Sequence, residues 1–238
     1  MIKLMTLVKT PVSVDANAFR DYWRSTFFAD FFAIESVDAH LMKAVHHHVL
    51  PNDIRDEEGI GNDQWAGVGT YYFNSRVGAE KVLADPAYHQ LQKQCAEMLP
   101  EIVHLLVDEV WIHNRDRSQL PLKMFAFFKR LPHLSRLEAL QYYQGPHATL
   151  GDEKVNKGRT VRYIQNHVLL DYQHPNPDYN FDGGPEIWFK SLDIAMDLFN
   201  DKAGMALLAE DEARFVVRAD LVHFLTDEVV ILERPVPG

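Results

Sequence analysis

Histidine is the residue type that points most directly to chemistry in this sequence. The chain has 12 histidines among 238 residues, and His46, His47 and His48 are consecutive. The imidazole ring titrates near neutral pH, so it can accept or donate a proton under physiological conditions. The excess of histidine therefore favours acid–base catalysis or ligand binding.

Tyr143 and His147 are spaced so that one helix can present both side chains together. Four residues separate them, which places them on the same helix face, although Gly145 and Pro146 can kink or end the helix between them. A histidine beside a phenol in an apolar pocket can transfer protons. The alternative is a histidine that caps the helix and is exposed to water.

His48 and His167 lie in segments that we predict to be strands. Because alternate residues of a strand share a face, His46 points with His48, and Tyr163 and Gln165 point with His167. A face of this mixed composition fits a ligand cavity. A solvated face at the edge of a sheet is the alternative.

His104 and His223 occupy matching places at the start of a predicted strand, each between apolar neighbours. We weigh a functional role equally against a buried neutral histidine held by one backbone partner. Aromatic residues on other predicted elements suit the walls of a pocket for an aromatic ligand, and they suit an ordinary core as well. We assign catalytic roles to His147, His167, Tyr143 and His223. We assign substrate contacts to His48, His46, His104, Tyr22, Tyr163, Trp188 and Phe127.

We expect no cofactor and no metal. The sequence has no H-E-x-x-H motif, no Gly-rich phosphate loop and no Gly-x-Ser-x-Gly elbow. His46 and His48 could chelate a metal with a third ligand from His104 or Asp108, but no carboxylate or cysteine lies at a defined metal-site spacing. Metal and haem binding are kept as minor alternatives.

The elements that must position these residues occur twice in the chain. Residues 3–9 (KLMTLVK) match residues 123–129 (KMFAFFK), and later matches in the same order place His48 on His167 and His104 on His223. The spacing stays at about 120 residues throughout, as expected of an internal duplication.

Each copy predicts the order β-α-β-β-α-β, the ferredoxin-like unit. The two units are expected at residues 1–114 and 121–238, with a polar linker at 115–120. Hydrophobic alternation predicts strands at 3–9, 43–50, 67–73 and 104–112, and at 123–129, 162–169, 186–192 and 223–231. Second helices are predicted at 76–98 and 193–214. Asp15 is the expected N-cap of the first helix in one copy, and Ser135 with Glu138 forms a capping box in the other. An α+β fold follows, in which two sheets cover each other's open faces.

The net charge and the single cysteine limit the kinds of partner and environment that we expect for the protein. The formal net charge of −10 argues against nucleic acid and against an anionic membrane surface. Cys95 is the single cysteine and cannot form an internal disulfide, so we expect a reducing, cytoplasmic environment. The N-terminal residues MIKLMTLVKTP lack the features of a signal peptide. The expected partner is a small aromatic molecule, and pairing of the two-repeat chain into a homodimer is left open.

The segment FFKRLPHLSRLEALQYYQGPHATL (127–150) resembles the opening of the EthD family, whose fold is the dimeric α/β barrel. The closing segments VDEVWI (107–112) and TDEVVI (226–231) resemble the family's last strand. The resemblance covers nearly the whole chain, as two fused tandem copies that would form an intramolecular barrel. It implies that Tyr143 and His147 occupy the family's aromatic and histidine positions, whereas the first copy has Thr26 at the place of His147.

The resemblance implies small aromatic or polyketide-derived ligands and cofactor-free carbon–carbon bond chemistry. We therefore predict a cofactor-independent lyase in which a histidine removes a proton from a phenolic compound and a one-carbon fragment, CO2 or formaldehyde, is lost. A polyketide-type cyclase and a non-catalytic binding protein for aromatic ligands are the alternatives. A haem or metal oxygenase is a weaker one.

Overall fold

The computed structural model describes residues 1–50, 65–116, 120 and 122–235. Residues 51–64, and residues 117–119 of the predicted linker, lie outside the described residues. The chain divides into two compact units. Unit 1 consists of Met1–Val49, Gln64–Leu106 and Glu228–Gly238, and unit 2 consists of Leu50–Asp63 and Val107–Asp227.

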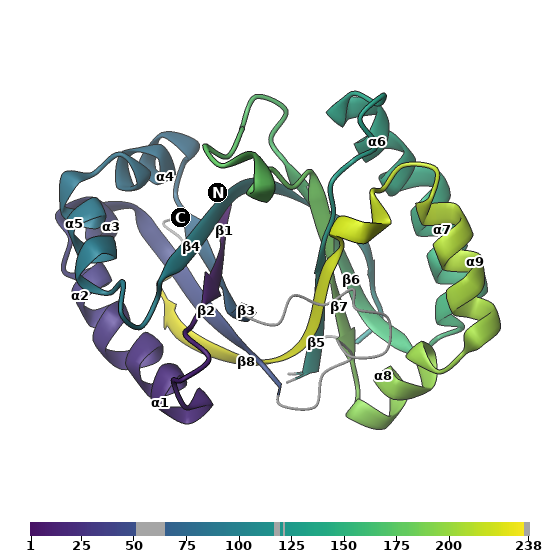
Figure 1. Ribbon diagram of the computed structural model, residues 1–238, viewed down its shortest axis with the longest axis horizontal. Helices are drawn as coiled ribbons and strands as arrows, with labels where there is room; N and C mark the ends of the chain where they lie inside the picture. The colour runs from purple at the N-terminus through teal and green to yellow at the C-terminus, as the bar shows by residue number, and fades with distance from the viewer. Residues whose placement is uncertain (51–64, 117–119, 121, 236–238) are drawn as a thin grey trace. The chain divides into compact units, whose positions relative to one another are not determined.

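Unit 1 contains an antiparallel sheet with β3 between β1 and β2. Its strands are β1 (Ile2–Lys9), β2 (Leu41–Val49) and β3 (Trp65–Phe73). Its helices are α1 (Ala16–Asp21), the π-helical segment η1 (Tyr22–Phe27), α2 (Phe28–Phe32), α3 (Glu35–His40), α4 (Arg76–Leu83) and α5 (Pro86–Gln94). These helices lie on one side of the sheet (Figure 1).

Unit 2 repeats this order. Its strands β5 (Leu122–Phe127), β6 (Thr160–Val168) and β7 (Gly183–Phe189) are antiparallel, with β7 in the middle. Its helical segments are α6 (Arg136–Tyr142), η2 (Tyr143–His147), α7 (Ala148–Leu150), η3 (Gly151–Asn156), α8 (Leu192–Phe199) and α9 (Lys202–Glu212). Two short 3-10 turns, η4 (Pro177–Tyr179) and η5 (Arg218–Asp220), complete it.

Two long strands, β4 (Glu101–Asn114) and β8 (Val222–Glu233), contribute residues to both units. In unit 2, β4 pairs with β6 and β8 pairs with β5, both antiparallel. The described strands follow the closed order β1-β3-β2-β8-β5-β7-β6-β4, the topology of an eight-stranded barrel. The mixed α/β class is therefore confirmed, while the ferredoxin-like units at 1–114 and 121–238 stay a prediction, because β4 and β8 cross the compact units.

The predicted helix starts are confirmed. The Asp15 carboxylate accepts hydrogen bonds from the backbone N–H groups of Asn17 and Ala18. Ser135 and Glu138 form the reciprocal capping box. These caps satisfy N–H groups that have no partner within a helix, so they fix where α1 and α6 begin.

The second helices are shorter than predicted. The segment 76–98 is divided between α4 and α5, because Asp85 caps a new helix that begins at Pro86. The segment 193–214 is divided in the same way, because Asp201 caps α9. The strand predicted at 186–192 ends at Phe189, since the Ser191 hydroxyl caps α8.

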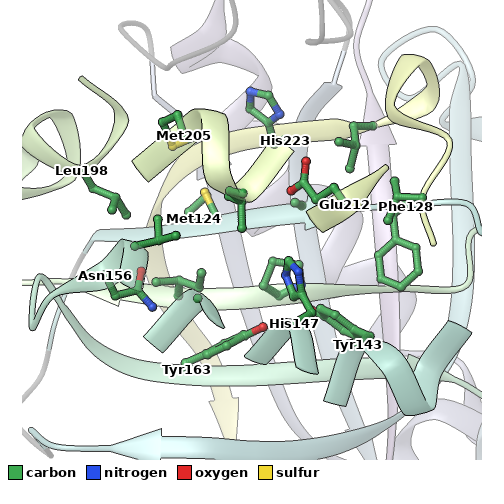
Figure 2. Close-up of a pocket in the computed structure, with 18 of the residues that line it drawn as sticks. Met124, Phe128, Tyr143, His147, Asn156, Tyr163, Leu198, Met205, Glu212 and His223 are labelled. Carbon is green, nitrogen blue, oxygen red and sulfur yellow. The ribbon is translucent and has the colours of Figure 1, made fainter. Parts of the chain in front are cut away.

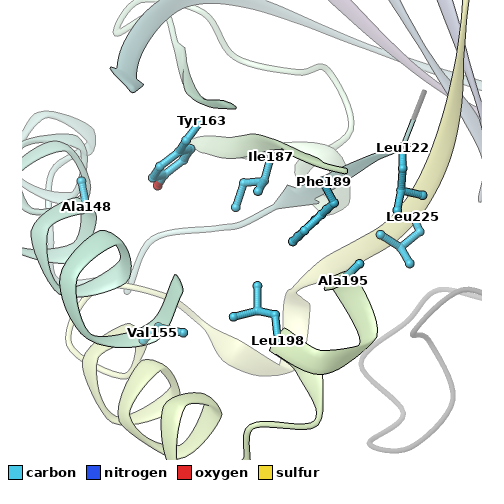
Figure 3. Close-up of a cluster of buried hydrophobic side chains, with 9 residues drawn as sticks. All are labelled: Leu122, Ala148, Val155, Tyr163, Ile187, Phe189, Ala195, Leu198 and Leu225. Atoms are coloured by element: carbon cyan, nitrogen blue, oxygen red, sulfur yellow. The ribbon is translucent and has the colours of Figure 1, made fainter. Parts of the chain in front are cut away.

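The hydrophobic core of unit 2 lies between its sheet and its helices. Figure 3 shows its buried side chains converging from strands and helices. The cluster consists of Leu122, Ala148, Val155, Tyr163, Ile187, Phe189, Ala195, Leu198 and Leu225. This core fixes the distance between the sheet and the helices that carry the candidate site. None of the described helices combines the length and the apolar character that a membrane span requires.

Candidate functional site

A cavity of about 150 Å³ lies in unit 2 between its sheet and its helices. Strand residues such as Met124 and Tyr163 form one wall, and helical residues such as His147 and Leu208 form the other. Figure 2 shows these side chains converging on a common space. Most of the wall is apolar, with a few polar groups, which is the usual composition of a small-molecule site.

His147 is held by a buried carboxylate. Its Nδ1 lies 2.8 Å from Oδ2 of Asp211 on α9, and the Tyr142 hydroxyl donates to Oδ1 of the same carboxylate at 2.6 Å. Asp211 is 5% exposed. A carboxylate accepts hydrogen bonds, so the arrangement assigns the proton to Nδ1 and leaves the lone pair on Nε2. This arrangement leaves Nε2 of His147 able to accept a proton.

Two effects set the protonation of His147 in opposite directions. Burial lowers its pKa below the ordinary value of 6.5, and the hydrogen bond and charge of Asp211 offset part of this shift. The ring is therefore neutral at physiological pH. A neutral imidazole is able to accept a proton.

Two tyrosines contribute phenols to the cavity wall. The Tyr143 ring lies 5.4 Å from the His147 ring, centroid to centroid, and burial raises the pKa of Tyr143 well above its ordinary value. Burial also raises the pKa of Tyr163 to about 12. The Tyr163 hydroxyl accepts a hydrogen bond from Gln165 Nε2 at 2.8 Å. Both phenols are therefore protonated and can serve as hydrogen-bond donors.

His167 lies behind Tyr143 and is not among the residues that line the cavity. Its ring is 5.7 Å from the Tyr143 ring, and its Nε2 lies 3.1 Å from Gln165 Oε1. Burial lowers the pKa of His167 to about 4. The structure thus brings His147, Tyr143 and His167 together, with His147 and Tyr143 on the wall and His167 supporting Tyr143.

Three further polar residues complete the lining. His223 of β8, opposite Ala126 of β5, and the buried Asn156 of η3 lie on the wall. Glu212 follows Asp211 at the end of α9, and its carboxylate lies 3.2 Å from Arg218 Nε. Glu212 places a carboxylate, paired with Arg218, on the cavity wall, and the sequence did not predict it.

Asp211 and Glu212 were missed, although the sequence carries a signal for them. Both are acidic residues in the last turn of α9, where the helix dipole disfavours negative charge. Acidic residues that depart from this preference often mark functional positions. The sequence could not show that Asp211 would meet His147, because 64 residues separate them.

Phe127 and Trp188 lie on the opposite face of the sheet from the cavity. Met124 and Ala126 line the cavity, so the alternation of β5 turns Phe127 away, where it stacks near Phe125. Trp188 is buried with the Lys123 ammonium 4.1 Å from its ring centroid. The structure does not bring these two aromatic residues to the cavity, because the sequence pattern does not say which face the helices cover.

The remaining predicted contacts lie in unit 1, away from the lining of this cavity. His46 stacks on Trp23 with 4.0 Å between centroids, and its Nε2 lies 2.9 Å from the Tyr71 hydroxyl. Burial, with a smaller effect of His48, lowers the pKa of His46 well below its ordinary value. The rings of His48 and Trp23 form a T-shaped pair with 5.5 Å between their centroids.

His104 and Tyr22 also belong to unit 1. The His104 ring contacts the Tyr88 hydroxyl at 2.9 Å and the Thr6 hydroxyl at 3.0 Å, so side chains of unit 1 hold it, rather than the single backbone partner considered above. Tyr22 is half-buried in η1. Neither residue lines the cavity of unit 2.

The equivalence of Thr26 with His147 needs a correction. The N-caps Asp15 and Ser135 begin matching helices, and counting from them places Phe27 opposite His147. The two π-helical segments end at these same residues. Phe27 is 3% exposed, so an apolar ring stands in unit 1 where unit 2 has the histidine.

The possible metal ligands and the single thiol were located in the described part of the chain. Across the described part of the chain, no group of three or more His, Cys, Asp or Glu residues is arranged to hold a metal ion. Cys95 is buried, and burial raises the pKa of its thiol to about 11. A thiol of this kind is a poor nucleophile.

Comparison with known proteins gives a family match for part of the chain and likenesses in fold. Residues 131–219 match the model of the EthD domain, a segment that contains Tyr143, His147 and Asp211. A solved anthrone oxidase-like protein is similar in fold, with a TM-score of 0.64 and 12% identity over 100% of this chain and 96% of that one. A chlorite dismutase of Candidatus Nitrospira defluvii gives a TM-score of 0.54 and 10% identity over 97% and 92% of the two chains. At such identities the likeness shows the fold alone. No curated protein matches the sequence.

Proposed function

Residues 131–219 match the model of the EthD domain, and from this match we propose that the cavity of unit 2 is the active site of a cofactor-independent enzyme acting on small, neutral phenolic compounds. The observation that carries the proposal is the pairing of His147 with the buried Asp211 at the wall of an apolar cavity. A histidine oriented by a carboxylate is a recurrent device for moving protons.

The charge of the cavity wall favours a neutral substrate. Among the described residues that line it, Glu212 is acidic and none is Lys or Arg. A carboxylate substrate about 6 Å from Glu212 would be repelled by roughly 3 kcal/mol at an effective dielectric constant of about 20. Arg218 offsets part of this charge from outside the lining. Loss of formaldehyde from a hydroxymethyl phenol is therefore favoured over loss of CO2 from an aromatic acid.

His147 can carry the protons of this reaction in sequence. Its Nε2 takes the phenol proton and returns it to the ring carbon that bears the hydroxymethyl group, giving a dienone. It then takes the hydroxymethyl proton. The carbon–carbon bond breaks, its electron pair restores the aromatic phenolate, and formaldehyde leaves. His147 reprotonates the phenolate, and the net change is one hydroxymethyl phenol to one phenol and one formaldehyde.

Tyr143 and Tyr163 position the ring oxygen in this scheme. Both phenols are buried and protonated, so either can donate a hydrogen bond to the oxygen on which negative charge develops. The size of the cavity, about 150 Å³, suits one aromatic ring. It favours this reaction over the folding of a long polyketide chain inside the cavity.

The test uses 4-hydroxybenzyl alcohol in D2O, followed by NMR. We expect phenol deuterated at the ring position that carried the hydroxymethyl group, together with equimolar formaldehyde. His147→Gln should lower the rate by about 100-fold or more. The matched control is His133→Gln, which replaces an exposed histidine of the same domain.

Two results would count against the enzyme. Tight binding of the phenol without any turnover would favour a binding protein instead. Full activity of His147→Gln would place the base elsewhere.

A further inference from the structure

Gly151 interrupts a row of side chains on the cavity wall. Tyr143, His147, Gly151 and Val155 are spaced by four residues along η2, α7 and η3, and all four line the cavity. The first two present aromatic rings and the last an isopropyl group. At Gly151 the row has no side chain.

The backbone does not require glycine at this position. Gly151 has φ −57° and ψ −50°, a right-handed helical conformation that every L-residue adopts. Gly145 differs, because it precedes Pro146 in a helix, where a Cβ would clash with the proline ring. The local chain conformation therefore explains Gly145 and leaves Gly151 unexplained.

Packing does not require glycine there either. A Cβ built on Gly151 meets no atom within 4 Å, whereas one built on Gly184 would lie 1.8 Å from the carbonyl oxygen of Ala126. Glycine inside a helix is less stable than alanine by about 1 kcal/mol. The remaining distinction of Gly151 is the open space of the cavity next to it.

Several apolar side chains of the cavity lie away from His147. Figure 2 shows Leu198, Met124 and Met205 at the other end of the cavity from His147 and Tyr143, with Asn156 and His223 near them. Leu208 and Phe199 add to the apolar lining. Methionine side chains adapt to irregular apolar groups, so this end suits an alkyl chain better than a rigid polar ligand.

The volume limits what the cavity can enclose. At about 150 Å³ it compares with engineered apolar cavities that hold one benzene ring. A ring placed between His147 and Tyr163 uses this space. Any substituent longer than a methyl group needs a way out, and Gly151 and Leu208 are both half-buried, at the margin of the cavity.

We propose that the ligand is a phenol with an apolar tail, and that Gly151 is the gap through which this tail passes from the cavity between η3 and α9. Gly151 thereby determines the length of ligand that the site accepts. This inference rests on the proposed function only for the phenolic head group.

The test measures binding rather than turnover, by titration calorimetry with 4-methylphenol and 4-pentylphenol. We expect the wild type to bind 4-pentylphenol at least tenfold more tightly. Gly151→Leu should keep its affinity for 4-methylphenol within about threefold and lose the advantage of the longer ligand. Thr149→Leu, an exposed position two residues away, is the matched control and should leave both affinities unchanged.

Other binding results would contradict the role of Gly151, the phenolic head group or the proposed reaction. Two results would contradict the proposed role of Gly151 as a gap for the tail. One is equal affinity of the wild type for both phenols. The other is an equal loss of affinity for both phenols in a folded Gly151→Leu protein. The smaller variant Gly151→Ala, expected to bind both ligands, guards against misfolding. If the wild type binds neither phenol, both the phenolic head group of the proposed ligand and the role of Gly151 are contradicted. Binding with the expected length dependence but no turnover of 4-hydroxybenzyl alcohol overturns only the proposed reaction.

Discussion

At the scale of single residues, the site depends on how burial and nearby charges shift the pKa of each histidine. His147 and His167 both touch the ring of Tyr143. His147 is hydrogen-bonded to the Asp211 carboxylate, whereas His167 is hydrogen-bonded to Gln165 and interacts with Asp108 through charge alone. Burial lowers the pKa of both rings, and Asp211 offsets part of the shift for His147. His147 is therefore the ring better suited to accept and release protons near neutral pH.

The pH dependence of proton transfer should report on Asp211. Only the neutral ring accepts a proton, so the rate should rise with pH through the pKa of His147, below 6.5, and then level off. Asp211→Asn removes the charge that raises this pKa. The inflection should move to lower pH, and the plateau should fall about 100-fold because the amide does not fix the tautomer.

The measurement is a pH–rate profile of formaldehyde release. Asp193→Asn, an exposed acid on α8, is the control. A variant whose inflection stays in place would show that Asp211 does not act on the base.

His167 should contribute to loss of stability in acid. The unfolded chain binds a proton on this ring near pH 6.5, whereas the folded chain does so only near pH 4. The stability is therefore complete above about pH 6.5 and is lost as the pH falls toward 4. After allowance for partial exposure the loss is about 2 kcal/mol.

Urea unfolding at pH 7 and at pH 4.5 measures this loss. His167→Gln should lose less stability over the interval than the wild type. An identical loss in the two proteins would assign the acid sensitivity to other groups.

At the scale of elements, the path from α6 through η3 determines which side chains meet. The capping box at Ser135 fixes the start of α6, and the π-helical turns of η2 and η3 carry the row from Tyr143 to Val155 along the cavity. π-helical turns are rare and frequently lie at functional sites. In our proposal, Gly151 keeps the cavity open at the cost of the higher helix propensity that alanine would have at this position.

Replacing Gly151 with alanine should therefore stabilise the protein. The conformation is helical and a Cβ meets no neighbour, so the gain is the helix propensity of alanine, about 0.5–1 kcal/mol. Thermal unfolding measures it. A lower melting temperature would mean that the cavity wall cannot accept even a methyl group.

At the scale of the whole molecule, the two units carry related elements with different interiors. In unit 1, Trp23 stacks on His46, and a Cβ on Gly67 would lie 2.6 Å from the Trp23 ring. Phe27 stands at the position of His147. These rings lie between the helices and the sheet of unit 1, so we expect unit 1 to lack a site of the kind found in unit 2.

We therefore expect one phenol to bind per chain. Titration calorimetry with 4-pentylphenol gives this stoichiometry directly. His46→Gln should leave the affinity and the turnover unchanged, because His46 stacks on Trp23 in unit 1 and does not line the cavity of unit 2. Two equivalent ligands per chain, or loss of binding in His46→Gln, would contradict this assignment.

Local chemistry made much of the fold predictable. Alternating apolar residues and the caps Asp15 and Ser135 specify strands and helix starts through nearest neighbours in the chain, so they can be read directly from the sequence. The divided helices were missed because the interruption at Asp85 competes with a continuous apolar pattern. The sequence placed Phe127 at the cavity, whereas it lies on the other face of the sheet. Alternation along a strand defines two faces, but it does not show which of them the helices cover.

The sequence by itself determined the duplication, the order of elements, and the pairing of Tyr143 with His147, because all of these depend on residues close in the chain or on direct repetition. Tertiary structure decided that Asp211 meets His147, that Glu212 charges the cavity, and that Phe127 and Trp188 face away from it. Such contacts join residues far apart in sequence, and their geometry is set by how helices pack on a sheet. No local pattern encodes that packing.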